Sequence, residues 1–81
     1  MLNSTQEVGK VSFNFSKLRG RIVEKYGTQT AFVKAFGVSE NVFSRKMNNK
    51  VRFNSDDIVK IVKMLDIPEN EINQYFFTQE V

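Results

Sequence analysis

The sequence has no cysteine, no histidine and no tryptophan, and only one proline among its 81 residues. The absence of cysteine excludes disulfides and thiolate metal sites, which fits a reducing cytoplasm. The absence of histidine removes the commonest general base and most transition-metal sites. No apolar run is long enough to span a membrane, and residues 1–12 lack the apolar core of a signal peptide. We therefore expect a cytoplasmic protein without a metal or other cofactor.

The acidic residues and glycines that remain do not form a catalytic pattern. Asp56 and Asp57 are neighbours in the sequence, so their side chains point apart on a helix, and a helix start explains both. The four glycines form no phosphate-binding loop. We therefore expect no enzymatic activity.

The composition is that of one small folded domain. Hydrophobic residues make up 41% of the chain and include eight phenylalanines, so the sequence is neither disordered nor fibrous. A chain of this length allows one hydrophobic core. We predict a folded domain over residues 13–77, preceded by a flexible arm at residues 1–12 and followed by a short tail at residues 78–81.

Apolar spacing predicts five helices, with no repeat and no strand pattern, and therefore an all-α fold. The first helix is expected from near Ser16 to Tyr26, capped by either Asn14 or Ser16. The last is expected from about Glu69 to Phe76, after a break at Pro68.

The fourth helix is predicted from polar residues that are typical of a helix start. Asn54 or Ser55 can cap it, while Asp56 and Asp57 favour its positive end. Its expected buried face consists of Ile58, Ile61, Val62 and Leu65.

Residues 27–50 contain the second and third helices, which meet at Gly37. Thr28 can cap the second helix by accepting a backbone N–H near Ala31. Gly37 ends it, because glycine adopts the left-handed conformation by which a chain leaves a helix. Its expected inward face consists of Phe32, Val33 and Phe36.

The third helix begins directly after this turn. Val38 is expected to be buried in the turn, and Ser39 can cap the helix. Phe43 and Met47 lie four residues apart and therefore share its inner side. The two helices together form a helix-turn-helix pattern.

This pattern resembles that of the lambda-repressor-like, or Xre-type, DNA-binding domains. The Q…GVS…S signature of that family is matched by Gln29, Gly37, Val38, Ser39 and Ser44. The likeness covers about residues 14–77, and this part of the chain resembles small regulators of phages and prophages of Gram-positive bacteria. It implies a compact five-helix lambda-repressor-like domain whose helix-turn-helix is formed by the second and third helices.

Three residues depart from the family pattern. Val33 stands where a small alanine is usual. Lys46 stands where an apolar residue is common, so we expect Met47 to pack inward while Lys46 faces outward. Asn49 replaces the usual glycine after the recognition helix, and asparagine tolerates the left-handed conformation better than most residues.

The resemblance implies that the third helix presents its first turns to the major groove of DNA. The expected base-reading residues are Glu40, Asn41, Ser44 and Arg45. The guanidinium of Arg45 can bond both acceptors of guanine, and the amide of Asn41 can bond adenine. The alternatives are a phosphate contact or a solvated charge for Arg45, a helix-entry role for Asn41, a favourable helix-start charge for Glu40, and packing alone for Ser44.

Six further residues are expected to contact phosphates: Gln29, Ser39, Lys46, Asn48, Lys50 and Arg52. Gln29 matches the position that family members use to hold a phosphate and brace the recognition helix. Contacts of this kind fix register without reading sequence. The alternatives are a simple helix-start side chain for Gln29 and ordinary loop residues for Asn48, Lys50 and Arg52.

Charge is distributed unevenly along the chain. Residues 17–52 hold nine basic and two acidic residues, whereas the rest holds three basic and seven acidic residues, for a net charge of +3. A positive segment that carries the motif favours a polyanionic partner. The alternative is that these charges are simply solvated.

Two functions follow from the sequence. The first is a sequence-specific DNA-binding transcriptional regulator of the Cro or prophage-repressor kind, with double-stranded operator DNA as its partner. The second is a protein-interaction module, such as an antirepressor or antitoxin, that binds another regulator protein. A homodimer through the C-terminal aromatics is also expected, because Tyr75, Phe76 and Phe77 cannot all enter one small core. The alternative is a tail whose Phe77 folds back on the domain.

Overall fold

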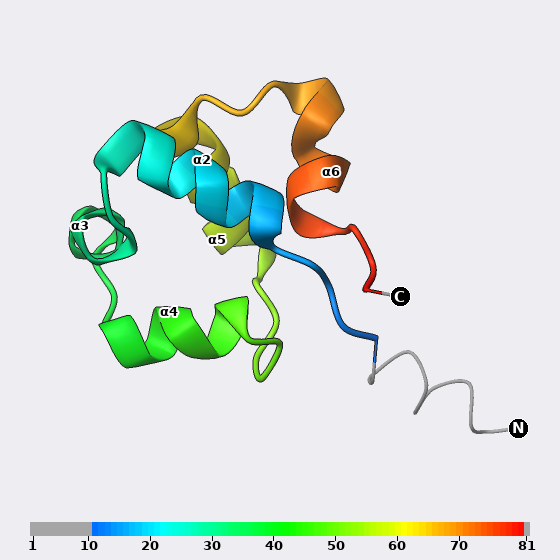
Figure 1. The fold of residues 1–81 in the computed structure, drawn as a ribbon, viewed down its shortest axis with the longest axis horizontal. Coiled ribbons are helices and arrows are strands. Elements are labelled where there is room, and N and C mark those ends of the chain that lie inside the picture. The colour runs from blue at the N-terminus through cyan, green and yellow to red at the C-terminus, as the bar shows by residue number, and fades with distance from the viewer. Residues whose placement is uncertain (1–10, 81) are drawn as a thin grey trace, which may run out of the picture.

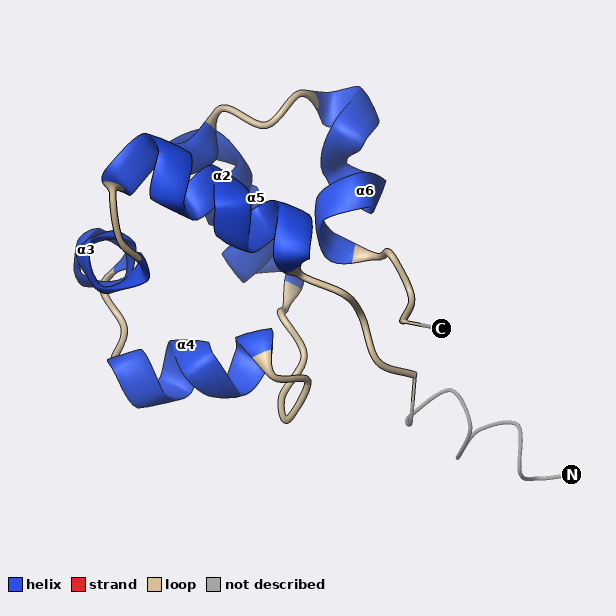
Figure 2. Cartoon of the chain, viewed as in Figure 1, coloured by secondary structure: helices blue, strands red, loops and turns tan. Residues whose placement is uncertain are grey.

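The computed structural model describes residues 11–80, and within that range the chain is a bundle of short helices (Figure 1). The elements, in chain order, are α2 (Ser16–Tyr26), α3 (Gln29–Phe36), α4 (Glu40–Met47), α5 (Ser55–Leu65), the 3-10 turn η1 (Glu69–Glu71) and α6 (Ile72–Phe76). Figure 2 shows only helices and loops in the described part of the chain, so the expected all-α fold with five helices is confirmed.

The core is built largely from aromatic rings. Phe43 of α4 is completely buried, and its ring centre lies 5.7 Å from that of Phe32, 5.9 Å from that of Phe36 and 5.8 Å from that of Phe53. These rings meet mainly edge to face, the arrangement that aromatic quadrupoles favour. The expectation that Phe32, Phe36 and Phe43 face inward is therefore confirmed, and Phe53 lies half-buried at the margin of the core.

Helix α2 connects the two halves of the bundle. It packs against α3, α5 and α6, and it crosses in front of α5 in Figure 1. Leu18 and Ile22, four residues apart on one face, are completely buried. The α3–α4 pair lies at one side of this scaffold, with α4 along an edge of the molecule.

The ends of α3 and α4 follow the chemistry of their sequence. The hydroxyl of Thr28 accepts the N–H of Ala31 at 3.0 Å, and that of Ser39 accepts the N–H of Val42 at 3.1 Å. Gly37 adopts the left-handed conformation, with φ of 98°, and ends α3. The expected helix-turn-helix connection is thus present, although Val38 is half-buried rather than fully buried.

Helix α5 begins with a capping box. The side chain of Asn54 accepts the N–H of Asp57 at 2.7 Å, while the carboxylate of Asp57 accepts the N–H of Asn54 at 3.1 Å. This exchange satisfies two backbone donors that the first turn of a helix leaves free. Of the two expected caps, Asn54 is therefore the one in use.

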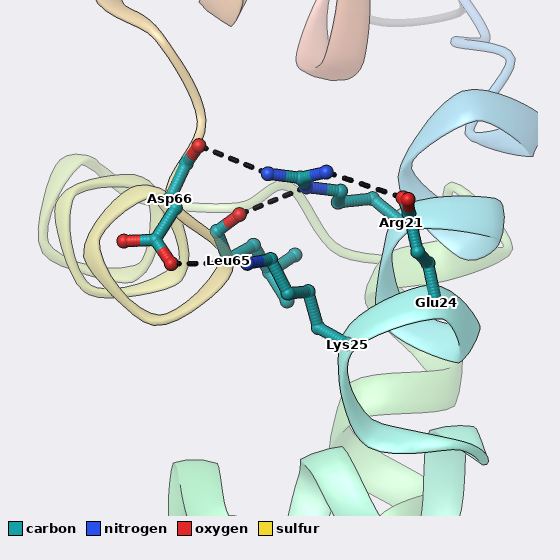
Figure 3. A network of polar contacts seen from close by, with 5 residues as sticks. All are labelled: Arg21, Glu24, Lys25, Leu65 and Asp66. Atoms are coloured by element: carbon teal, nitrogen blue, oxygen red, sulfur yellow. Dashed lines mark hydrogen bonds and ion pairs between the residues drawn. The ribbon is translucent and has the colours of Figure 1, made fainter.

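The other end of α5 is capped by side chains from α2 (Figure 3). The guanidinium of Arg21 donates to the carbonyl of Leu65 at 2.9 Å and to that of Asp66 at 3.1 Å, and it also pairs with Glu24. Lys25 pairs with the carboxylate of Asp66 at 3.2 Å. Cations at a helix C-terminus bond carbonyls that have no partner within the helix. Arg21 and Lys25 therefore hold α2 against the end of α5.

Two helix boundaries differ from the sequence prediction. Phe15 occupies the position before α2, and no side chain caps that helix; the side chain of Asn14 accepts only the N–H of Ser16, at 2.8 Å. The expected last helix is divided into η1 and α6, because the chain passes through a tighter turn after Pro68 before α6 begins.

The two ends of the described chain lie side by side, which the sequence did not predict. Phe13 and Gln79 form an antiparallel bridge. The N–H of Asn14 donates to the carbonyl of Thr78 at 2.7 Å, and that of Glu80 donates to the carbonyl of Ser12 at 2.9 Å. This isolated bridge joins the two segments without adding a strand to the all-α fold of the described residues. Residues 1–10 of the expected arm lie outside the described residues.

Candidate functional site

Three residues form the exposed outer face of α4. Asn41, Val42 and Arg45 point away from the core, which α4 contacts through Phe43 and Met47. Val42 is 43% exposed, one of five large apolar side chains that are exposed within residues 11–80. Both Asn41 and Arg45, expected as base-reading residues, are therefore accessible, and each is free to contact a partner.

The start of α4 is linked to the start of α3 by a side-chain contact. The amide of Gln29 donates to the carboxylate of Glu40 at 3.3 Å. This hydrogen bond connects the start of α3 to the start of α4, where Glu40 is the first residue of the helix. The roles of Gln29 and Glu40 on DNA, and that of the capping residue Ser39, stay predictions.

The end of α4 carries a second local contact. The amide of Asn48 donates to the carbonyl of Ser44 at 2.9 Å and to its hydroxyl at 3.2 Å. This contact closes the last turn of the helix, where carbonyls lack partners within the helix. Ser44 is half-buried and Asn48 is exposed, so their expected DNA contacts stay predictions.

Lys46 does not face outward, and this expectation is wrong. Its side chain and that of Asp57 are each only 14% exposed, and the two form an ion pair between α4 and the start of α5. The charge at Lys46 is drawn inward because Asp57 of the capping box lies beside it. The expected phosphate contact of Lys46 would therefore require this pair to open.

Arg52 and Asn49 hold the segment that precedes α2. The guanidinium of Arg52 donates to the carbonyl of Val11 and to the side chain of Asn49, and it lies 4.9 Å from the ring centre of Phe13. Asn49 has φ of 63°, so the expected left-handed conformation is confirmed. Arg52 is exposed but committed to these contacts, so its expected phosphate contact also stays a prediction.

The basic side chains of residues 17–52 are less available to a partner than the net charge of that segment indicates. Within residues 11–80, five of its nine basic side chains contact other parts of the chain: Lys17, Arg21, Lys25, Lys46 and Arg52. Next to α4, Arg45 and Lys50 are exposed, and the described residues give neither a hydrogen-bond or ion-pair partner. The surface around α4 is thus mixed in character, with few free cations.

A second exposed apolar residue follows α4. Val51 is 41% exposed in the loop that leads to α5. The surface that we call the α4 face therefore comprises Asn41, Val42, Arg45, Lys50 and Val51. Neither valine was predicted as a functional residue; Val42 lies within α4 and Val51 lies in the loop that follows it.

The C-terminal aromatics are divided between the core and the surface. Tyr75 and Phe76 are buried, whereas Phe77 is 47% exposed. The ring of Phe77 packs edge-on against that of Phe13, with 5.7 Å between their centres. The three rings therefore do not share one core, as expected, and Phe77 folds back on the domain, as the alternative to a dimer contact proposed.

Comparison with known proteins identifies a phage regulator among the similar structures. The family described as "Protein of unknown function (DUF739)" matches residues 11–79. The solution structure of the modulator of repression (MOR) of the temperate bacteriophage TP901-1 from Lactococcus lactis is 44% identical in sequence. The match covers 82% of this chain and 89% of that chain, with a TM-score of 0.73. No curated protein matches the chain.

These findings support a likeness to phage regulators but not the finer assignment to the Xre or Cro type. The described residues contain no helix that is both long and apolar enough to cross a membrane. Between residues 11 and 80, no group of acidic side chains is arranged to hold a metal ion.

Proposed function

The chain belongs to the DUF739 family, and we propose that it is a phage regulatory protein that modulates repression by binding a repressor protein through the α4 face. The observation that carries this proposal is the exposed Val42 at the centre of the outer face of α4. Asn41 and Arg45 beside it supply hydrogen-bonding groups. An apolar centre with an arginine at its edge is a common composition of protein interfaces.

The distribution of charge favours a protein partner over DNA. Affinity for DNA comes largely from cations that neutralise phosphates. Near α4, Lys46 is paired with Asp57, and Arg52 holds the segment before α2. Glu40, at the start of the same helix, adds a negative charge that phosphates repel.

The printed name of the similar phage protein supports the same class of function. That protein is called a modulator of repression, a name that describes an effect on a repressor. By its sequence identity and coverage, this chain is similar enough to share such a role. We propose that the partner of this chain is the repressor encoded by the same phage genome.

Replacing Val42 by aspartate tests the proposed surface. We expect affinity for the repressor to fall by about 2 kcal/mol, roughly thirtyfold, because a charge would be buried at the interface centre. Isothermal titration calorimetry measures this change. Val59→Asp is the matched control, since Val59 is 53% exposed and lies on α5, outside the α4 face. Equal losses in both variants, or none in Val42→Asp, would reject the surface.

Direct reading of DNA is the second proposed function, and the helix-turn-helix geometry favours it. Asn41 and Arg45 are exposed on successive turns of α4, where a recognition helix presents its base-reading side chains. The same purified protein, titrated with random duplex DNA at low salt, separates the two functions. Tight, salt-dependent binding would favour DNA, and its absence would favour the repressor.

A homodimer through the C-terminal aromatics stays a proposal. Phe77 is the exposed member of that group, although it already packs on Phe13. Pairing of two copies through Phe77 would place two α4 faces on one assembly.

A further inference from the structure

Lys60 of α5 contacts the turn between α3 and α4. Its Nζ donates a hydrogen bond to the carbonyl of Phe36, the last residue of α3, with 2.6 Å between the two atoms. The same Nζ lies 4.8 Å from the centre of the Phe36 ring. A Cβ added at Gly37 would lie 3.9 Å from this Nζ, so the ammonium group also lies close to the backbone of the turn. Lys60 is therefore attached to the point where the chain leaves α3 and leads to α4.

The end of α3 suits an ammonium group. The last carbonyls of a helix have no partner within the helix, and that end carries the negative part of the helix dipole. The face of an aromatic ring also attracts a cation. None of the three ion pairs among residues 11–80 includes Lys60. The carbonyl and the ring of Phe36 therefore hold the charge of Lys60 in place of a carboxylate.

A second polar contact joins α5 to α4 itself. Lys46, in the last turn of α4, pairs with Asp57, which lies three residues before Lys60 in α5. Residues three apart share one face of a helix. The hydrogen bond from Gln29 to Glu40, by contrast, joins α4 to α3. One face of α5 thus contacts both the turn that precedes α4 and the last turn of α4.

Two separated contacts determine the direction of a helix, whereas one contact leaves a pivot. Phe43 and Met47 also attach α4 to the core, but the burial of apolar side chains is non-directional. A hydrogen bond, in contrast, depends on the distance and the angle between particular atoms. Lys60 before α4, and the pair of Lys46 with Asp57 near its end, therefore fix the direction of α4 relative to α5.

We propose that Lys60 is a positioning residue for the α4 face. Its ammonium group holds the turn between α3 and α4 against α5, and so sets the direction in which α4 presents Val42 and Arg45. The consequence for binding rests on the proposed function. A partner that binds one orientation of α4 loses affinity when α4 adopts several, because only the competent fraction of the molecules binds it.

Three substitutions separate the ammonium group of Lys60 from the rest of its side chain. Lys60→Met keeps an unbranched, flexible side chain but removes the donor to Phe36. Lys60→Arg keeps a cation that can donate to the carbonyl and lie over the ring, so it should restore the contact. Lys63→Met is the matched control, because it makes the same change at an exposed lysine in the last turn of α5.

Residual dipolar couplings of the backbone amides measure the orientation of α4 relative to α5 in the isolated protein. In Lys60→Met we expect the couplings of α4 to depart from the orientation found in the unmodified protein, while those of α2 and α6 keep it. Lys60→Arg and Lys63→Met should match the unmodified protein. Unchanged α4 couplings in Lys60→Met, or equal changes in either of the other variants, would overturn the proposal.

A second measurement tests the contact of Lys60 without any substitution, so it holds even if Lys60→Met fails to fold. We expect a hydrogen-bond scalar coupling between Nζ of Lys60 and the carbonyl carbon of Phe36 in the unmodified protein. An ammonium signal of Lys60 that lacks this coupling, or that is lost through rapid exchange with water, would also overturn the proposal.

Calorimetric titration with the repressor separates this proposal from the proposed function. We expect the affinity of Lys60→Met to be about fivefold lower, and that of Lys60→Arg and Lys63→Met to stay close to that of the unmodified protein. Because the magnetic resonance measurements use the isolated chain, they decide the role of Lys60 whether or not a repressor binds. A changed orientation of α4 with unchanged affinity would support that role and reject the α4 face as the binding surface.

Discussion

Phe43→Ala is expected to lower the free energy of unfolding by about 3–5 kcal/mol, the usual cost of removing a buried aromatic ring. Phe43 is completely buried, and its ring contacts those of Phe32, Phe36 and Phe53. The surrounding rings belong to α3 and to the loop before α5, so the cavity cannot close by moving one helix. A domain of this size is stable by about 5–10 kcal/mol, so the variant should be near the limit of folding.

Denaturation by urea, followed by circular dichroism, measures this loss. Phe77→Ala provides the control, because the same ring is removed from a position that is about half exposed. We expect a loss of about 1 kcal/mol there, from the contacts with Phe13 and Phe76. Similar losses at the two positions would mean that the aromatic cluster around Phe43 is not the centre of the core.

Lys46→Met is expected to destabilise the fold by about 3 kcal/mol, because it leaves the carboxylate of Asp57 without its ion-pair partner in a largely buried position. The capping bond from the N–H of Asn54 to Asp57 remains, but the opposite charge is lost. The pair also connects α4 to the start of α5, so its loss should loosen the orientation of the α4 face.

A double-mutant cycle isolates this interaction. Adding Asp57→Asn to Lys46→Met removes the unpaired charge, and we expect it to restore most of the lost stability. Lys25→Met is the comparison, since its partner Asp66 is largely exposed and an exposed pair contributes about 1 kcal/mol or less. If the double variant were as unstable as the sum of the single variants, the two side chains would not interact.

The helix pattern could be predicted because local chemistry determines most of it. Thr28, Ser39 and Asn54 cap their helices, and Gly37 ends α3, as their side chains favour. The spacing of apolar residues likewise identified Phe43 and Met47 as the inner side of α4. These features depend on residues within one or two turns of each other, which a sequence displays directly.

The contacts that join distant segments could not be predicted. The pairing of residues 12–14 with 78–80 depends on how α6 directs the chain, which no local pattern reveals. Lys46 was expected outside because Met47 was expected to pack inward in its place, and its partner Asp57 is eleven residues away. Phe13 was overlooked because its contacts are with Asn49, Arg52 and Phe77, none of them near it in sequence.

The sequence predicted functional residues on the third helix, and the structure shows only whether their side chains are exposed. The sequence placed Asn41 and Arg45 on the outer side of that helix, and the structure exposes both. The sequence prediction treated every basic residue as available to a partner, whereas Lys46 and Arg52 contact other residues of the chain. That difference, together with the exposed Val42, is why we propose the second of the two expected partners, a repressor protein, ahead of DNA.

The most direct test of the α4 face is to titrate isotope-labelled protein with the unlabelled repressor of the same phage genome and to record backbone amide shifts. We predict the largest changes at Asn41, Val42 and Arg45, with little change at Val59 on α5. Changes concentrated on α5 and α6, with α4 unaffected at saturating repressor, would contradict the assignment of the α4 face as the binding surface.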